Sequence, residues 1–368
     1  MGNTSSESQE NQDSLMNQNN QLTKASNNTS HFKPELSLIL KMQMFQTHFL
    51  RERQLRPDRL ISTLGHNENI LQLFQPVSKC KTLKDLDVTI LDVCSISSKE
   101  FKMFSQKSKH LYCLQRLWLV FSRSNVFESS VLENISLYLK PLKSLLQLNL
   151  MFFRCSAITL KALKTLAMSI SKHPKLTSVK LNFYACQAIS FEGLSGIIKA
   201  LAKLKQLSHF DLELTSFRGI QSESLAKLFF NLEQLVKLRS LRLSFGDCHG
   251  VDVESLKCLG MALSSLESLT EIELNFAVCS EVDDEGLEGL MRGIESLESL
   301  ERLALNLIGC SEVGDKGVKS IVDGVKSLKE LKNVRLVLSN CQKISKEMME
   351  LFQSEEKGDG KTKWKIEM

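Results

Sequence analysis

The chain has 368 residues, of which 42% are hydrophobic, and a formal net charge of +5. No apolar run reaches the roughly 18 residues that a membrane-spanning helix needs, and the N-terminus lacks the apolar core of a signal peptide, so we expect a cytoplasmic protein. The charge is slight for this length, and we expect the basic residues to be spread over helix faces, which argues against a nucleic-acid-binding surface.

Residues 1–31 differ in composition from the rest of the chain. Twenty of them are Asn, Gln, Ser or Thr, so the segment cannot bury enough apolar surface to offset its ordering entropy, and we expect a disordered tail. The start, Met-Gly-Asn-Thr-Ser-Ser, fits the N-myristoylation pattern with Gly2 as acceptor, or is a chance match in a polar tail. Because one acyl chain binds membranes marginally, we expect weak membrane contact at most.

Residues 32–82 are predicted to form an N-terminal helical cap and a partial repeat. Five apolar residues have the spacing of one helix face: Leu36, Ile39, Leu40, Met44 and Phe45. Such a helix would cover the open end of the array that follows. Alternatively, Pro34-Glu35-Leu36 followed by Ile39-Leu40 resembles the start of an F-box, which would imply the substrate receptor of a ubiquitin ligase and binding to an adaptor of the Skp1 kind.

From residue 83 to residue 353 one pattern returns with a fixed period. Nine apolar residues stand in register, each 31 positions after the last: Leu86, Leu117, Leu148, Val179, Phe210, Leu241, Ile272, Leu303 and Val334. A second apolar column lies two residues further on, and a column of Ile, Val and Phe lies ten residues further on. A fixed period of this length is the signature of a stacked repeat protein.

Each unit is predicted to be a strand, a turn and a helix. The segment LRLSF alternates with period two, which is typical of a strand with one buried face. Apolar residues then follow at intervals of three and four, as on one stripe of a helix: Leu256, Leu259, Leu263 and Leu266. Helix N-caps are predicted at Ser190, Asp283 and Ser345, and Ser97 with Glu100 has the spacing of a capping box.

The pattern LxxLxLxFxxCxxIxxxxLxxLxxxLxxL resembles a leucine-rich repeat of the ribonuclease-inhibitor-like, cysteine-containing type. The resemblance implies an α/β horseshoe-shaped solenoid of about nine repeats over 83–353, with parallel strands on the concave face and helices on the convex face. Unlike ribonuclease inhibitor, the chain does not alternate two repeat types. Residues 354–368 end in the alternating segment KTKWKIEM and are predicted to form a C-terminal capping strand.

Six of the ten cysteines occupy one column of the repeat, seven residues after the anchor position: Cys155, Cys186, Cys248, Cys279, Cys310 and Cys341. No pair has the short C-x-x-C spacing of a metal site, and nothing indicates the secretion that disulfides require. We therefore predict a ladder of buried thiols that act as small hydrophobic residues and weak donors to the turn backbone.

The strand residues between the core leucines are expected to point into the concavity, because side chains alternate between the faces of a strand. The early units present an apolar and aromatic cluster there: Trp118, Val120, Met151, Phe153 and Tyr184. Charged residues are interspersed and continue in the later units: Lys180, Asp211, Glu213, Arg242, Glu273 and Arg335. Large solvent-facing apolar clusters tend to mark interaction sites, so these residues are the candidate partner-binding surface. Alternatively, the N-terminal segment covers the cluster.

No phosphate-binding loop, metal-ligand pair or nucleophile motif is present, and the histidines share no spacing with carboxylates. His209 and Asp211 are expected on one strand, a pairing that is usually plain surface. We therefore expect no enzyme, cofactor or metal, but a scaffold or adaptor subunit of an intracellular assembly, including a cytoskeletal or ciliary one. A GTPase-activating protein of the leucine-rich-repeat type is the enzymatic alternative, although neither its catalytic loop nor its acidic tail is recognisable.

Overall fold

The computed structural model describes residues 54–55, 59–64, 77, 82–90, 98–122, 129–155, 158–187, 189–217, 219–350 and 362–367. The chain divides into two compact units, Met1–Leu50 and Arg51–Met368, and every described residue belongs to the second. The predictions for the disordered tail, for Gly2, for the F-box start and for the helix around Leu36 to Phe45 therefore fall outside the described residues.

The strands of the described residues join into one sheet whose order follows the sequence. They are β1 (Gln54–Leu55), β2 (Arg59–Leu64), β3 (Asp85–Ile90), β4 (Arg116–Ser122), β5 (Gln147–Phe153), β6 (Ser178–Asn182), β7 (His209–Glu213), β8 (Ser240–Ser244), β9 (Glu271–Asn275), β10 (Arg302–Asn306), β11 (Asn333–Val337) and β12 (Lys363–Glu367). β1 is antiparallel to β2, and all later neighbours are parallel.

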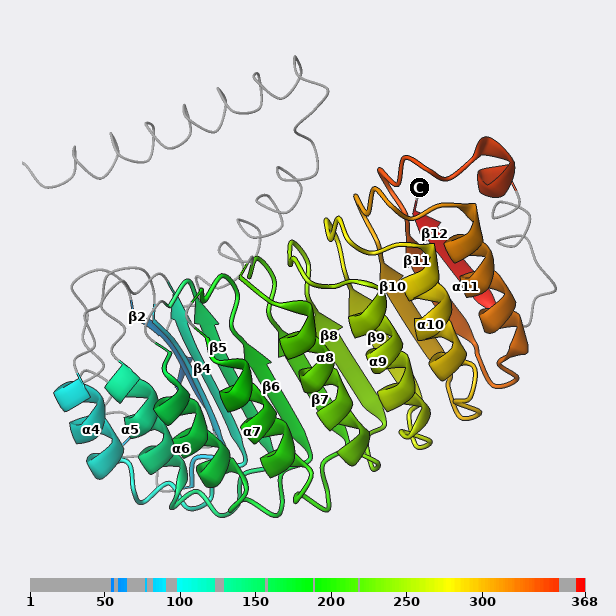
Figure 1. Cartoon of the computed structure of the whole chain (residues 1–368). Helices are drawn as coiled ribbons and strands as arrows, with labels where there is room; N and C mark the ends of the chain where they lie inside the picture. Colours follow the sequence, from blue (N-terminus) through cyan, green and yellow to red (C-terminus); the bar gives the residue numbers. More distant parts are fainter. Residues whose placement is uncertain are drawn as a thin grey trace, which may run out of the picture. The chain divides into compact units, whose positions relative to one another are not determined.

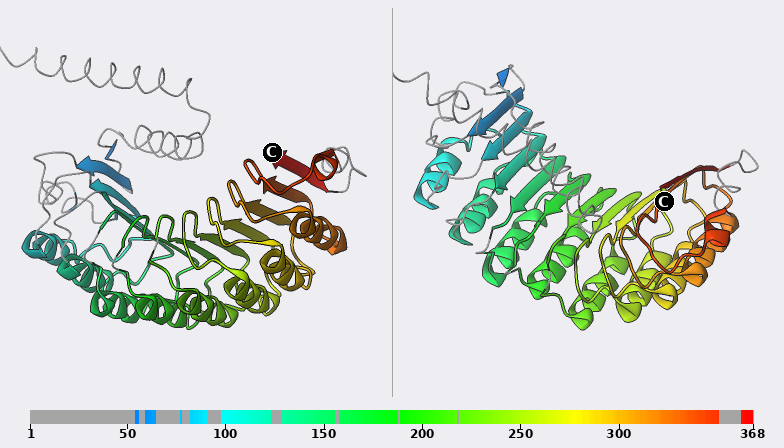
Figure 2. Two further views of the ribbon diagram at one scale, coloured as in Figure 1. Left: turned by 45° about the horizontal axis from the view of Figure 1, so that its top comes forward. Right: turned by 90° about the horizontal axis from the view of Figure 1, so that it is seen from above.

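Helices alternate with these strands and cover one face of the sheet (Figure 1, Figure 2). They are α4 (Ser98–Lys107), α5 (Ser129–Leu139), α6 (Leu160–Ile170), α7 (Phe191–Leu201), α8 (Ser222–Phe230) with the 3-10 helix η2 (Asn231–Gln234), α9 (Val253–Ser264), α10 (Asp284–Ile294) and α11 (Asp315–Ser327). Since each parallel strand must return to the same end of the sheet, a crossover helix between strands is the expected connection.

The register of the sheet confirms the predicted period. Leu86 lies opposite Leu117, Leu241 opposite Ile272, and every anchor residue between and beyond them pairs with its counterpart in the next unit. The fold is therefore the predicted α/β repeat solenoid with one open parallel sheet. None of the described helices is long and apolar enough to cross a membrane.

The two ends of the sheet carry strands outside the register of the repeat. Leu60 of β2 lies opposite Leu86 of β3, and these two residues are closer in sequence than the anchors of later units, so the first unit is shorter than the others. The helical pattern seen in residues 32–82 did not predict β1 or β2. At the other end β12 pairs in parallel with β11, with Trp364 opposite Val334.

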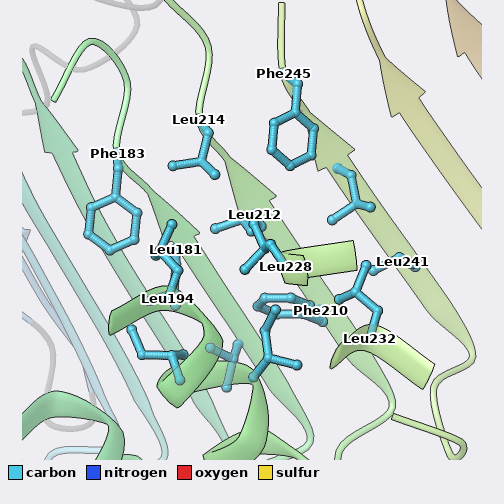
Figure 3. Close-up of a cluster of buried hydrophobic side chains, with 14 of the residues drawn as sticks. Leu181, Phe183, Leu194, Phe210, Leu212, Leu214, Leu228, Leu232, Leu241 and Phe245 are labelled. Atoms are coloured by element: carbon cyan, nitrogen blue, oxygen red, sulfur yellow. The ribbon is translucent and has the colours of Figure 1, made fainter. Parts of the chain in front are cut away.

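The core lies between the sheet and the helices. Figure 3 shows Phe183, Leu214 and Phe245 from successive units facing Leu194 and Leu228 of the helices. These three residues belong to a column four positions after the anchor, in which Phe121, Phe152 and Phe183 stack with centroid distances of 5.4 and 5.5 Å. Removing any one large side chain from such a column leaves a cavity that the neighbouring units cannot fill.

A left-handed residue lies in the turn after each strand from β5 to β11. Arg154, Ala185, Ser216, Asp247, Val278, Gly309 and Asn340 recur with the period of the repeat, and all have φ between 54° and 70°. From Arg154 to Gly309 the backbone N–H donates to a carbonyl of the next unit, at 2.6–3.0 Å. This backbone ladder continues the sheet into the turns, and it requires a positive φ even where the residue is β-branched.

The cysteine column lies directly after this turn, and its six thiols are buried and free. Five of them donate to a carbonyl of the preceding unit, at Sγ–O distances of 3.1–3.3 Å: Cys186, Cys248, Cys279, Cys310 and Cys341. Burial raises the pKa of Cys279 to about 12 and that of Cys341 to about 11. Because the thiolate is the reactive form, this burial disfavours covalent chemistry at Cys279 and Cys341.

His173 replaces leucine in another core column. The same position is Leu142 in the preceding unit and Leu204 in the next, and all three side chains are buried. Neither ring nitrogen of His173 has a hydrogen-bond partner that meets normal geometry among the described residues. Burial, with the nearby charge of Lys143, lowers the pKa of His173 to about 4.

The predicted helix caps at Ser190 and Asp283 are confirmed. Ser190 Oγ accepts from the N–H of Gly193 at 3.3 Å, and Asp283 Oδ1 accepts from that of Gly286 at 2.9 Å. Ser345 Oγ accepts from the N–H of Met348 at 3.1 Å. Ser97 falls outside the described residues.

Candidate functional site

The candidate site is the face of the sheet that carries no helices, called the inner face below (Figure 2). Two rows of side chains cross it, one residue from each strand. The first row is Asp87, Trp118, Asn149, Lys180, Asp211, Arg242, Glu273, Ala304 and Arg335. The second row, two residues further on, is Thr89, Val120, Met151, Asn182, Glu213, Ser244, Asn275, Asn306 and Val337.

The aromatic part of the inner face lies on β4, β5 and the turn after β6. Trp118, Phe153 and Tyr184 are each half-buried, and the rings of Phe153 and Tyr184 lie 6.3 Å apart at 47°. These three residues are called the aromatic trio below, and each is partly exposed, although the ring nitrogen Nε1 of Trp118 is buried. Partly exposed aromatic rings of this kind supply large contact areas at low entropic cost when a partner binds.

The expectation that the whole cluster faces solvent is wrong for two of its members. Val120 and Met151 are only 4% and 3% exposed. They lie opposite each other in the second row, between Thr89 and Asn182, which are buried as well. Strands about 4.8 Å apart bring such side chains into contact with one another.

The polar residues of the second row have a structural role that the sequence did not reveal. The side-chain oxygens of Asn182, Glu213, Asn275 and Asn306 each accept from the backbone N–H two residues later, at 2.9–3.2 Å. Each bond closes the turn that follows its strand, as Asn and Asp side chains do in Asx-turns. The recurrence of Asn at this position of the repeat could have predicted these turn-closing hydrogen bonds.

At the turn-closing position of the second row, Glu213 supplies a carboxyl group where the other three residues are asparagines. Its Oε1 accepts from the backbone N–H of Thr215 and also bonds the Thr215 hydroxyl, which in turn lies 2.9 Å from Ser244 Oγ. Burial raises the pKa of the Glu213 carboxyl above its ordinary value, although the hydrogen bonds from Thr215 and Ser244 oppose this. Glu213 is therefore engaged in its own turn.

The charged residues of the first row are paired across neighbouring strands. Lys180 lies 2.6 Å from Asp211, and Arg242 lies 2.5 Å from Glu273. Arg335 lies 3.1 Å from Glu367 of β12. Exposed pairs of this kind contribute little to stability, about 0–1 kcal/mol. A partner that approached this face would meet ordered, mutually neutralised charges, which favour specificity over affinity.

The inner face is hollowed at β9 to β12. The first row carries only Ala304 there, between Glu273 and Arg335, and a depression of ≈ 260 Å³ opens around it. Elsewhere on this face His209 Nδ1 lies 2.8 Å from Ser208 Oγ. Among the described residues no group of three or more His, Cys, Asp and Glu side chains is placed to hold a metal ion.

The inner face thus brings together most of the residues predicted from the sequence. Phe153 and Tyr184 are in contact there, while Trp118 lies opposite Asn149, four residues back along the strands. Val120 and Met151 are buried, and Glu213 is partly buried. The class of protein that this architecture defines is a repeat solenoid with an open parallel sheet.

Comparison with known proteins adds little to this description. No family model matches the chain, and no curated protein matches its sequence. Among solved structures it is similar to a chain in the crystal structure of the Rad7 and Elc1 complex in yeast, with 14% sequence identity over 87% of this chain and 84% of that chain, and a TM-score of 0.33. A likeness at that TM-score carries no argument about function.

Proposed function

We propose that this protein is a non-catalytic scaffold that grips a protein partner with its inner face. The observation that carries the proposal is the aromatic trio, Trp118, Phe153 and Tyr184, which is partly exposed on a face that the helices leave open. Aromatic residues dominate the binding energy of protein interfaces, where a few of them contribute about 2 kcal/mol or more each. The paired charges beside the trio would select among partners by matching or opposing theirs.

The finer points of the proposal follow from the sequence. The repeat is of the leucine-rich, ribonuclease-inhibitor-like type, which the buried cysteine column supports. The protein acts in the cytoplasm as an adaptor subunit of a larger assembly, for which a cytoskeletal or ciliary structure is one setting. Because a solenoid is a stiff platform, it suits assembly rather than chemistry.

The test is affinity purification of the full chain from its native cell, followed by identification of the retained proteins. The inner-face variant carries Trp118→Ala, Phe153→Ala and Tyr184→Ala. The matched control, Tyr112→Ala with Phe230→Ala, removes exposed aromatic rings outside the inner face. We expect a partner that wild type and control retain and the inner-face variant loses, while circular dichroism shows all three folded. A partner retained equally by all three would refute the proposal.

A further inference from the structure

A second surface lies along the edge of the array where helices lead into strands, the lower edge in Figure 1. Four consecutive loops there each present two exposed basic residues: Lys140 and Lys143, Lys172 and Lys175, Lys203 and Lys205, Lys237 and Arg239. These eight residues are called the basic edge below. The expectation that basic residues are spread over helix faces is wrong here, because the fold gathers these eight from four successive units of the repeat.

The basic edge is not neutralised by the protein itself. No member of it forms an ion pair with a described residue, whereas the lysines and arginines of the inner face do. Glu233 is the single acidic residue within these described loops. Like charges held this close repel one another and attract an anionic partner.

Complementing the helix dipole does not explain the basic edge. Cations near helix C-termini are favourable in general, since the dipole is negative there. In the next two units, however, the same loops carry acidic residues, Glu267, Glu295 and Glu298, and the helices form equally well. The basic edge is therefore a property of the surface of four particular units and not a requirement of the fold.

Exposed apolar side chains accompany the basic edge. Leu137, Met168, Phe230 and Met261 occupy one column of the repeat in the last turns of α5, α6, α8 and α9. Tyr112 lies in the loop between α4 and β4, and Val236 lies in the loop before β8. Their exposed fractions run from 44% to 60%. In α10 and α11 the same column holds Arg292 and Asp323. The column is interrupted by Lys199 in α7, and it extends one unit beyond the basic edge, to Met261 of α9.

We propose that the basic edge and its apolar column form a docking surface for a bilayer that contains anionic phospholipid. Lysine and arginine near such a surface attract it electrostatically, while apolar side chains that stand out from the same edge enter the headgroup–acyl boundary. A hollow of ≈ 580 Å³ lined by Lys205, Lys237, Arg239, Ser208 and Thr270 offers cations and hydroxyls to a lipid phosphate. A nucleic acid would use the cations but not the apolar column.

The test is co-sedimentation of the full chain with phosphatidylcholine vesicles, with and without phosphatidylserine. Protein made in bacteria carries no acyl group on Gly2, which removes that contribution. The charge variant is Lys205→Glu, Lys237→Glu and Arg239→Glu. Its matched control reverses three exposed lysines remote from the edge, Lys316, Lys319 and Lys346, and has the same net charge.

We expect wild type and control to sediment only with vesicles that contain phosphatidylserine. The charge variant is expected to bind at least a hundredfold more weakly, because each basic residue near an anionic surface contributes about fivefold. An apolar variant, Met168→Gln with Phe230→Gln and Met261→Gln, is expected to lose about tenfold at unchanged charge.

Two results would overturn the proposal. The first is no difference between wild type, the charge variant and the apolar variant in binding to phosphatidylserine vesicles. The second is binding to a DNA or RNA duplex that the charge variant loses and the apolar variant keeps, with no vesicle binding, which would assign the basic edge to nucleic acid. Neither result depends on the inner face, since its aromatic variant is expected to bind vesicles as wild type does.

Discussion

The contact between α9 and α10 depends on glycine, and replacing one of these glycines provides a sharp test of the packing. A Cβ built on Gly293 would lie 1.8 Å from the carbonyl oxygen of Gly260, 2.3 Å from its carbonyl carbon and 2.6 Å from its Cα. All three atoms belong to backbone, so no side-chain rotation relieves the overlap. Real Cβ atoms essentially never approach closer than 3.0 Å, so the helices would have to separate by about 1.2 Å.

We therefore expect Gly293→Ala to lower the free energy of unfolding by about 2 kcal/mol. Overpacking in a dense interior costs about 1–3 kcal/mol, and separating two helices also loosens the units on both sides. Alanine regains about 1 kcal/mol of helix propensity, which offsets part of the loss. The estimate is the balance of these two opposing effects.

Gly196→Ala is the matched control, because Gly196 also lies inside a helix but a Cβ there would meet nothing within 4 Å. Only the propensity gain remains, so this variant is expected to be more stable than wild type by about 0.5–1 kcal/mol. Urea unfolding followed by circular dichroism measures both. Equal midpoints for Gly293→Ala and wild type, or a loss of stability in both variants, would refute the close approach of α9 and α10.

Three further predictions concern stability. Val278 has φ of 63°, so we expect Val278→Gly to raise the free energy of unfolding by about 1 kcal/mol. Gly309→Val, at the equivalent turn of the next unit, is expected to lower it. If both variants shift the urea midpoint in the same direction, the left-handed turn is contradicted. The pKa of His173 is about 4 in the folded protein, against an ordinary value of 6.5. Between pH 6.5 and pH 4 the unfolded state therefore binds more protons than the folded state. The free energy of unfolding is expected to fall over this range by on the order of 3 kcal/mol. His173→Leu is expected to remove this dependence, and acid unfolding curves that match wild type would disprove the assignment. Leu243→Ala is expected to cost about 2–5 kcal/mol as a core truncation and Trp118→Ala much less; equal losses of melting temperature would mean that the faces are assigned wrongly.

The fold could be predicted from the sequence because the same apolar pattern recurs in every unit of the repeat. A single apolar residue such as Leu241 says little, but nine in register specify which face of every strand is buried. The resulting columns are the ones that pair in the sheet. The helix caps at Ser190 and Asp283 were accessible for a local reason, because their side chains act within one turn.

The parts that were missed depend on backbone geometry or on neighbours from other units. The left-handed turn column holds residues as different as Arg154, Val278 and Gly309. Residue type therefore does not predict the positive φ at this position. Alternation along its strand places the side chain of Met151 on the inner face, but it does not show that this side chain is buried there. β1 and β2 lie where the pattern does not match the repeat register.

The candidate surfaces were accessible to different degrees. Alternation placed Trp118, Phe153 and Tyr184 on the inner face, but it could not tell that Lys180 and Asp211 neutralise each other across strands. The basic edge was missed because its residues are evenly distributed along the sequence. Only stacking of the units turns such a distribution into a continuous strip.

The most direct measurement of the central claim is site-specific photo-crosslinking of the inner face in the native cell. A photoreactive phenylalanine derivative would replace Tyr184 on the inner face, and Tyr112 on the helix side in a parallel variant. A protein adduct at position 184 that is absent at position 112, and that disappears when Trp118 and Phe153 are changed to alanine, is the result we predict. Adducts at position 112 with none at position 184 would contradict the claim that this solenoid holds its partner on the inner face.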